Sequence, residues 1–279
     1  MNPVFELRNG VLIPQIGFGT WQIRNPHDIK ESLRVALEAG YRHIDTAQIY
    51  GNEALIGEAL QELNVPREEL FLTSKVWNTS QGYDQTMLAF EETLRKLQTK
   101  YLDLYLIHWP AVNLHQDYKT MNRETYRAME TLYKQGKIRA IGVSNFYVHH
   151  LEALLPHVEI TPMVNQIEFH PGNPMPDVVS FCQAIGILVE AYSPMMKGKV
   201  FQVPLLQEIA QKYHRTIPQI VLRWILDQGV LPLSKSITKE RIVQNFDVFD
   251  FTLSKEDQEV IATLQSMGRV GTHPDVANY

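Results

Sequence analysis

The chain has 279 residues, of which 44% are hydrophobic and 20% charged, and its formal net charge is −5. This composition is typical of a globular protein. It argues against nucleic-acid binding and against a polybasic membrane patch, since both need clustered lysine and arginine. No apolar run reaches the length of about 18 residues that a membrane span needs, and the first residues lack a signal-peptide pattern. We therefore expect a cytoplasmic protein that binds neither nucleic acid nor membrane.

The chain contains one cysteine, Cys182. A single cysteine can form neither a disulfide within the chain nor a zinc site built from cysteine clusters. Because it lies in a stretch with helical character, residues 177–186, we expect it to be packed inside the protein.

Eight short apolar runs alternate with longer segments of helical periodicity. The runs are residues 13–19, 41–45, 70–75, 101–109, 137–146, 162–169, 186–194 and 229–235. Several are apolar without interruption, as parallel strands covered on both faces should be. Eight strand–helix units in this length predict one domain over residues 1–279, a TIM (β/α)8 barrel. A doubly wound open sheet is the alternative; it would need a strand order that the sequence does not display.

Two pieces fall outside the eight units. Residues 4–14 have strand character around Asn9-Gly10, a hairpin signal, and we expect this hairpin to plug the bottom of the barrel. Residues 251–268 predict an extra helix near the C-terminus, with Ser254 as N-cap and Asp257 three positions later. Residues 271–279 lack helical periodicity, and we expect them to form a mobile arm.

Polar or aromatic residues follow each predicted strand. In a TIM barrel the chemistry is carried at the carboxyl ends of the strands. The residues at those ends are Trp21, Asp45 with Tyr50, Lys75 with Trp77, His108 with Trp109, Ser144 with Asn145, Gln166, Tyr192 with Ser193, and Lys235 with Ser236. Each alone has a structural explanation, such as a helix cap or a satisfied core histidine. Their common position predicts an active site at one rim.

Four of these residues suit the reduction of a carbonyl group. A tyrosine has a pKa of about 10 and is a weak acid near neutral pH. One positive charge at about 4 Å, with an effective dielectric of about 20, contributes roughly 4 kcal/mol to ionisation of the phenol, or about three pKa units. Lys75 could supply this charge, Asp45 could hold Lys75, and His108 could orient the carbonyl oxygen toward Tyr50. A hydrolase elbow and the usual metal-binding spacings are absent, so we expect no metal.

The hydride source is indicated by a different stretch. The sequence has no complete Rossmann fingerprint, because Gln22 stands where its third glycine would be. TIM barrels often bind phosphate beside the last two strands. Lys235 and Ser236 precede a predicted helix whose Arg241, Gln244 and Asn245 share one face. Lys235 and Arg241 suit the 2′-phosphate of NADPH, and Gln244 and Asn245 would lie near its adenine. Tyr192 could stack on the nicotinamide, and Ser144, Asn145 and Gln166 suit its carboxamide.

The chain resembles the aldo-keto reductases. The similar blocks are GFGTW, GYRHIDTAQIYGNE, LFLTSKVWN, YLDLYLIHWP, GKIRAIGVSNF, NQIEFHP, EAYSP and KSITKERIVQNFDVFDF, and they occur in the family's order over nearly the whole chain. The resemblance implies a (β/α)8 barrel that uses NADPH/NADP+. It maps the catalytic tetrad onto Asp45, Tyr50, Lys75 and His108, with Tyr50 as proton donor. It maps the cofactor contacts onto Ser144, Asn145, Gln166, Tyr192, Ser193, Lys235, Ser236, Arg241, Gln244 and Asn245.

The sequence departs from the family's pattern in places. Residues 193–200 read SPMMKGKV where the family often has SPLGRG, Ser234 stands where proline is usual, and the tail is short compared with vertebrate members. The chain is most similar to a prokaryotic-type branch that includes 2,5-diketogluconate and glyoxal or methylglyoxal reductases.

We therefore expect a monomeric, NADPH-dependent reductase of small aldehydes and ketones. Its substrate pocket would be lined by Trp21, Trp77, His108 and Trp109. Two alternatives stay open: a cofactor-binding regulatory subunit on the same barrel, and an aldolase that forms a Schiff base through Lys75.

Overall fold

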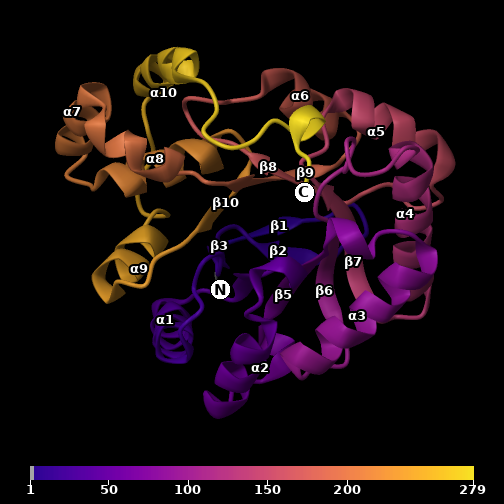
Figure 1. Ribbon diagram of the computed structural model, residues 1–279. Helices are drawn as coiled ribbons and strands as arrows, with labels where there is room; N and C mark the ends of the chain where they lie inside the picture. Colours follow the sequence, from indigo (N-terminus) through magenta and orange to yellow (C-terminus); the bar gives the residue numbers. More distant parts are fainter. Residues whose placement is uncertain (1–2) are drawn as a thin grey trace.

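The computed structural model describes residues 3–279, which fold around a closed barrel of eight parallel strands (Figure 1). The strand order is β10-β3-β4-β5-β6-β7-β8-β9. The strands are β3 (Gly17–Gly19), β4 (His43–Asp45), β5 (Phe71–Val76), β6 (Leu102–Ile107), β7 (Ile138–Ser144), β8 (Val164–Glu168), β9 (Leu188–Tyr192) and β10 (Leu231–Ser234). The predicted TIM barrel is confirmed, and the open sheet is excluded because β10 pairs with both β3 and β9.

Helices surround the barrel (Figure 1). They are α1 (Pro26–Ala39), α2 (Glu53–Glu62), α3 (Tyr83–Leu97), α4 (Tyr118–Lys134), α5 (Val148–Leu154), α6 (Pro176–Ala184), α7 (Pro204–Lys212), α8 (Ile217–Asp227), α9 (Lys239–Phe246) and α10 (Lys255–Ala262). Their apolar faces are turned inward, and α1, for example, buries Ile29 and Leu33. Cys182 is buried in α6, as expected. Within residues 3–279, no helix combines the length and apolar character needed to cross a bilayer.

An antiparallel hairpin of β1 (Val4–Glu6) and β2 (Leu12–Pro14) covers the amino-terminal end of the barrel. Its Ile13 packs in one apolar cluster with Leu104 and Leu231, which lie inside the barrel. The expected plug is therefore present. The predicted first strand, residues 13–19, is wrong in its extent, because Pro14 ends the hairpin and only residues from Gly17 join the barrel.

The C-terminal part begins as expected and ends differently. The Ser254 hydroxyl caps α10 by accepting from the backbone N–H of Asp257. The expectation that residues 271–279 form a mobile arm is wrong. This segment crosses the mouth of the barrel, where it makes hydrogen bonds and ring contacts described below. Its last residue lies near the centre of the ring of helices in Figure 1.

Candidate active site

Asp45, Tyr50, Lys75 and His108 come together at the carboxyl rim of the barrel, as predicted. Asp45 ends β4, Lys75 is the second-last residue of β5, and His108 directly follows β6. A short 3₁₀ turn, Gln48–Tyr50, returns Tyr50 over the same rim. The strands are parallel and adjacent, so their ends bring these side chains to one point.

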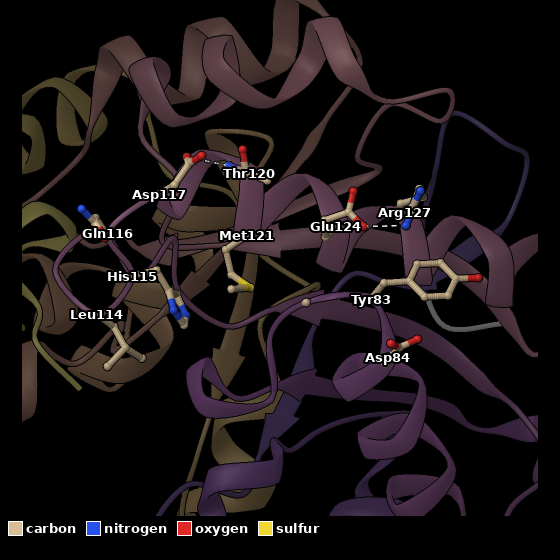
Figure 2. A pocket seen from close by; sticks show the side chains of 11 residues that line it. Tyr83, Asp84, Leu114, His115, Gln116, Asp117, Thr120, Met121, Glu124 and Arg127 are labelled. Carbon is tan, nitrogen blue, oxygen red and sulfur yellow. Dashed lines mark hydrogen bonds and ion pairs between the residues drawn. The ribbon is translucent and has the colours of Figure 1, made fainter.

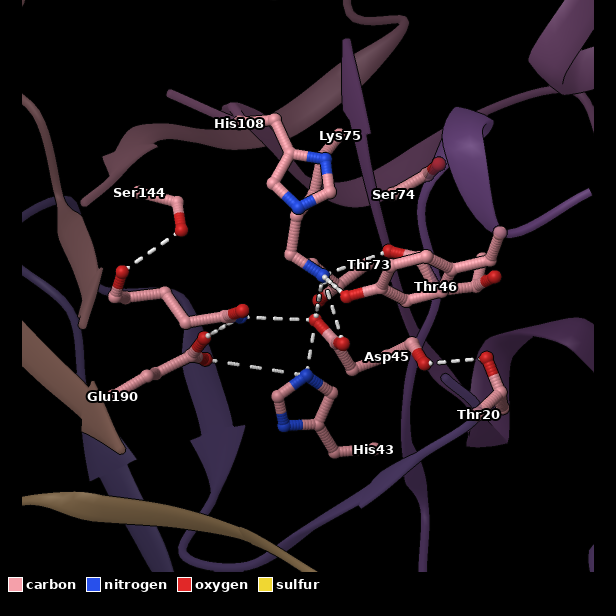
Figure 3. A network of polar contacts seen from close by, with 12 residues as sticks. Thr20, His43, Asp45, Thr46, Thr73, Ser74, Lys75, His108, Ser144 and Glu190 are labelled. Atoms are coloured by element: carbon pink, nitrogen blue, oxygen red, sulfur yellow. Dashed lines mark hydrogen bonds and ion pairs between the residues drawn. The ribbon is translucent and has the colours of Figure 1, made fainter. Parts of the chain in front are cut away.

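Lys75 is fully buried and is the link between Asp45 and Tyr50. Its Nζ atom lies 2.8 Å from each carboxylate oxygen of Asp45 and also donates to the carbonyl oxygen of Thr46 at 2.9 Å (Figure 3). Burial lowers the pKa of Lys75, but Asp45, Tyr50 and Glu190 together raise it above its usual value. The amine is therefore an ammonium ion at neutral pH.

The Tyr50 hydroxyl lies 3.5 Å from the Lys75 Nζ atom, at the limit of a hydrogen bond. Burial raises the pKa of Tyr50, and Lys75 lowers it by less. Lys75 therefore lowers the pKa of Tyr50, as predicted, but the pKa as a whole is raised. The sequence-based prediction of a lowered pKa was wrong because it left out burial of the ring. In this structure Tyr50 is a protonated donor at neutral pH.

His108 packs against the rings of both Tyr50 and Trp77, with centroids 5.8 and 5.2 Å away. Burial, and secondly the Lys75 charge, hold the pKa of His108 well below its usual value. Its imidazole is therefore neutral, and its Nδ1 atom has no hydrogen-bond partner within the described chain. A neutral imidazole beside Tyr50 is suited to hold a carbonyl oxygen.

Three further polar residues, which sequence reasoning did not single out as a group, lie beneath this cluster. The Gln166 amide nitrogen donates to Asp45 Oδ2 at 2.9 Å and to Glu190 Oε2 at 2.8 Å. Glu190 Oε1 lies 4.0 Å from His43 Nε2 (Figure 3). Glu190 and His43 were missed. The available signal was a titratable side chain, His43 or Glu190, inside each of two runs, 41–45 and 186–194, that were expected to be strands.

The residues predicted for the carboxamide lie beside the tetrad and are joined to one another. Asn145 donates to the carbonyl oxygen of His108 at 2.9 Å and accepts from the Tyr192 hydroxyl at 2.6 Å. The Ser144 hydroxyl donates to the Gln166 carbonyl oxygen at 2.8 Å. Ser193 follows β9 with a left-handed backbone, φ 54°. The side chains of Ser144, Asn145 and Tyr192 are thus held by hydrogen bonds within the protein itself.

The residues predicted for the 2′-phosphate and the adenine lie after β10 and on α9. Lys235 and Arg241 are exposed, and among residues 3–279 neither has a carboxylate partner. Gln244 is also exposed, and Ser236 caps the turn by accepting from Thr238 N at 3.0 Å. Asn245 differs from expectation: it is buried and donates to Ser234 Oγ at 3.3 Å. The predicted shared face is therefore divided, with Asn245 turned toward the barrel.

The predicted substrate pocket is lined by aromatic rings and is partly covered. Trp21 is half exposed, whereas Trp109 is 8% exposed. Trp77 stacks on Tyr279, with centroids 5.9 Å apart and ring planes 10° apart, and Tyr279 also meets the edge of Trp109 at 5.3 Å. Asn78 donates to the main-chain oxygen of Tyr279. The C-terminal segment is therefore part of the pocket wall, which the sequence did not predict.

A separate cavity of about 580 Å³ lies at the amino-terminal ends of α3 and α4 (Figure 2). Its polar groups mostly satisfy one another: Asp117 accepts from the backbone N–H of Thr120, and Glu124 pairs with Arg127. None of the tetrad residues lines it. The reactive set is therefore at the barrel mouth.

Comparison with known proteins agrees with this geometry. Residues 15–266 match the Aldo/keto reductase family. Glyoxal reductase of Bacillus subtilis (strain 168) is 50% identical over 270 residues, which are 97% of this chain and 95% of that protein. Methylglyoxal reductase DkgA of Escherichia coli (strain K12) is 41% identical over 277 residues, 98% of each. A crystal structure of a Gox0644 variant in complex with NADPH is 37% identical, with a TM-score of 0.92 over 100% of both chains. The match over nine-tenths of the sequence, on a barrel with this rim, shows that the chain belongs to the aldo/keto reductase family.

Proposed function

We propose that this aldo-keto reductase reduces small, reactive dicarbonyl compounds, glyoxal and methylglyoxal among them, with NADPH, and that Tyr50 is the proton donor. The observation that carries the proposal is the buried Lys75 ammonium between the Asp45 carboxylate and the Tyr50 hydroxyl. The similarity to glyoxal and methylglyoxal reductases supports the substrate class. The narrow aromatic mouth made by Trp77, Trp109 and Tyr279 supports a small substrate.

The residues of this chain divide the work of the reaction. NADPH, when bound, supplies a hydride from nicotinamide C4. Tyr50 gives its phenolic proton to the carbonyl oxygen as negative charge develops there. Lys75 stabilises the resulting phenolate, and Asp45 holds the Lys75 side chain in place. The neutral His108, which packs against Trp77, orients the carbonyl oxygen by a hydrogen bond.

The donors and acceptors fit the proposed cofactor. Lys235 and Arg241 are two exposed cations without a carboxylate partner within residues 3–279, as expected of groups that clamp a phosphate. Asp45 and Glu190 both accept hydrogen bonds from the side-chain nitrogen of Gln166. The side-chain oxygen of Gln166 is therefore left to accept from the carboxamide N–H group of the nicotinamide.

The two alternatives are weakened by the same contacts. A Schiff-base aldolase needs a neutral, accessible amine. Lys75 is instead charged, fully buried and engaged with Asp45 and Thr46. A purely regulatory barrel does not need a proton donor. Here Tyr50, Lys75 and Asp45 are arranged as one.

The proton-donor role is tested with Tyr50→Phe. We expect the variant to bind NADPH with the parent's affinity and to lose about 100-fold or more in kcat for methylglyoxal, the range of general acid catalysis. NADPH binding is measured by quenching of tryptophan fluorescence, and turnover by loss of the reduced nicotinamide absorbance. Parental turnover by a variant that binds NADPH normally would remove the assignment.

The 2′-phosphate role is tested with Lys235→Ala combined with Arg241→Ala. We expect Kd for NADPH to rise by about tenfold or more, as loss of charge-assisted contacts predicts, while Kd for NADH changes little. Lys239→Ala, an exposed lysine on the same helix, is the control. Equal losses for NADPH and NADH would contradict the role.

We also propose that residues 1–279 act as one domain and as a monomer in the cytoplasm, without nucleic-acid or membrane partners. The net charge of −5 and the single, buried cysteine support this setting.

A further inference from the structure

A second carboxyl group, Glu190, lies inside the barrel beneath the tetrad, with no accessible surface. It is joined to the tetrad through one bridge, because the Gln166 amide nitrogen donates to both Glu190 Oε2 and Asp45 Oδ2. Its other oxygen, Oε1, has no hydrogen-bond partner within the described residues. Figure 3 shows Glu190, Asp45 and His43 converging beneath Lys75.

The strands around Glu190 bring one cation and two carboxyl groups together. From β4 come Asp45 and His43, and from β5 comes Lys75, while β8 contributes the uncharged Gln166. The segment of β10 that pairs beside Glu190 is Leu231 to Ser234, which has no charged side chain. Lys75 is already engaged with both oxygens of Asp45. Glu190 therefore has no cation of its own.

His43 does not supply a cation to Glu190. Burial, and secondly Lys75, lower the pKa of His43 to about 3, so its ring is neutral. Its Nε2 atom is also shared with the Thr73 hydroxyl at 2.9 Å. Two carboxyl groups that share a single cation in a buried site do not both ionise readily, and the one without direct contact, Glu190, keeps its proton.

We propose that Glu190 is a positioning residue for carbonyl reduction: as a neutral acid it fixes the Gln166 amide and leaves the Lys75 charge free to act on Tyr50. The proposal rests on Tyr50 being the proton donor. If Glu190 ionises, a second negative charge appears beneath Lys75. That charge opposes formation of the Tyr50 phenolate and so weakens Tyr50 as an acid.

The pH at which this happens follows from the surroundings of Glu190. Burial, and secondly the Asp45 charge, raise the pKa of Glu190 to about 8, while Gln166 and Lys75 lower it by less. Below that pH Glu190 is neutral and Tyr50 is the stronger acid. Above it, proton transfer slows.

The test compares Glu190→Gln with the parent in single-turnover reduction of methylglyoxal by the enzyme–NADPH complex, from pH 6 to pH 10, so that the chemical step itself is followed. Glutamine keeps the shape and can still accept from Gln166, but it does not ionise. Between pH 7 and pH 9 the rate should fall in both proteins. We expect the factor by which it falls to be at least about three times larger in the parent than in Glu190→Gln. Superimposable pH profiles would overturn the proposal.

The matched control is Glu53→Gln. Glu53 is also a buried carboxyl group beside β5, and it accepts from the hydroxyl groups of Ser74 and Thr93 at 2.7 and 3.0 Å, without contact to Asp45 or Gln166. We expect its pH profile to match the parent's. If Glu53→Gln reduced the fall in rate between pH 7 and pH 9 as much as Glu190→Gln does, the effect would be structural and the proposal would fail.

A second variant, Glu190→Met, keeps the volume but removes the acceptor. Like Glu190→Gln, it should show a smaller fall in rate between pH 7 and pH 9 than the parent. In addition, its Kd for NADPH should be raised, because Gln166 is then held by Asp45 alone. Should Glu190→Gln not fold, a fall in rate in Glu190→Met as large as the parent's would overturn the proposal. Tyr50→Phe separates the two claims: if it is inactive while Glu190→Gln behaves as the parent, only the role of Glu190 fails.

Discussion

At the scale of single residues, the site depends on one buried cation that serves several acceptors. The Lys75 ammonium is bound by both oxygens of Asp45 and by the Thr46 carbonyl oxygen, and it faces the Tyr50 hydroxyl. The free energy of such a buried pair is asymmetric: removing one partner leaves an unpaired charge in the interior, whereas removing both charges does not.

We therefore expect Lys75→Met to lower the free energy of unfolding by about 3–5 kcal/mol, because it leaves Asp45 as a buried charge without a cation. The double variant Asp45→Asn with Lys75→Met should recover part of that loss and yet stay inactive, since Tyr50 has still lost its cation. Urea unfolding and methylglyoxal turnover measure the two effects. Recovery of turnover in the double variant would refute the role of Lys75 in acidifying Tyr50.

At the scale of elements, the segment 268–279 behaves as a strap across the barrel mouth. Glu168, at the end of β8, accepts from the backbone N–H groups of Val270 and Gly271 at 2.5 and 2.9 Å. Asn113 donates to the carbonyl oxygen of Asp275 at 2.7 Å, and His150 Nε2 lies 2.9 Å from the Asp275 carboxylate. These anchors lie in three different loops and helices, so they exist only in the folded barrel.

The end of the strap narrows the site, because Tyr279 stacks on Trp77. Tyr279→Ala should open the mouth and raise kcat/KM for a bulky aromatic aldehyde relative to methylglyoxal. An aromatic pair contributes about 0.5–1.5 kcal/mol, so a change of about 2- to 12-fold is expected in that ratio. Val276→Ala is the control, since Val276 is 64% exposed on the same strap. An unchanged ratio in Tyr279→Ala would show that Tyr279 does not restrict the substrate.

At the scale of the whole molecule, buried histidines make stability depend on pH. Burial, and secondly the neighbouring His149, lower the pKa of His150 to about 4. Between the ordinary histidine pKa of about 6.5 and this value, the unfolded chain binds a proton that the folded chain does not. The contribution of His150 to stability is therefore complete above pH 6.5 and is lost as the pH falls toward 4. Glu190 acts in the opposite sense, because its raised pKa favours the folded state at low pH.

We accordingly expect His150→Gln to lose less stability than the parent when the pH is lowered from 6.5 to 5. The difference should be about 2 kcal/mol, since each pKa unit corresponds to about 1.4 kcal/mol. Urea unfolding at the two pH values measures it. The control is His149→Gln, because His149 is adjacent but exposed, and this variant should keep most of the parent's loss. The same loss in His150→Gln as in the parent would contradict a buried, neutral His150.

Much of the architecture was readable from local patterns. The alternation of apolar runs with amphipathic segments predicted eight strands, and the barrel places Asp45, Lys75 and His108 at one rim as that pattern implied. The hairpin around Asn9-Gly10 and the Ser254 cap were also predicted, because each depends on a few neighbouring residues. Boundaries were less exact, as the split of residues 13–19 shows.

The features that were missed depend on contacts between residues far apart in the chain. Gln166 contacts Asp45, and links it to Glu190, only because the closed barrel places β8 and β9 across its interior from β4. The strap is held by such distant partners, and the net pKa of Tyr50 depends on how deeply its ring is buried.

The sequence by itself therefore determined the order of strands and helices and which side chains reach the rim, because period and strand position are properties of neighbouring residues. Only the tertiary structure decided the charge state of the site and the cover over it. Burial and electrostatic interactions depend on distance in space, and residues such as Asp45 and Glu190, remote in the chain, share one cation only after folding.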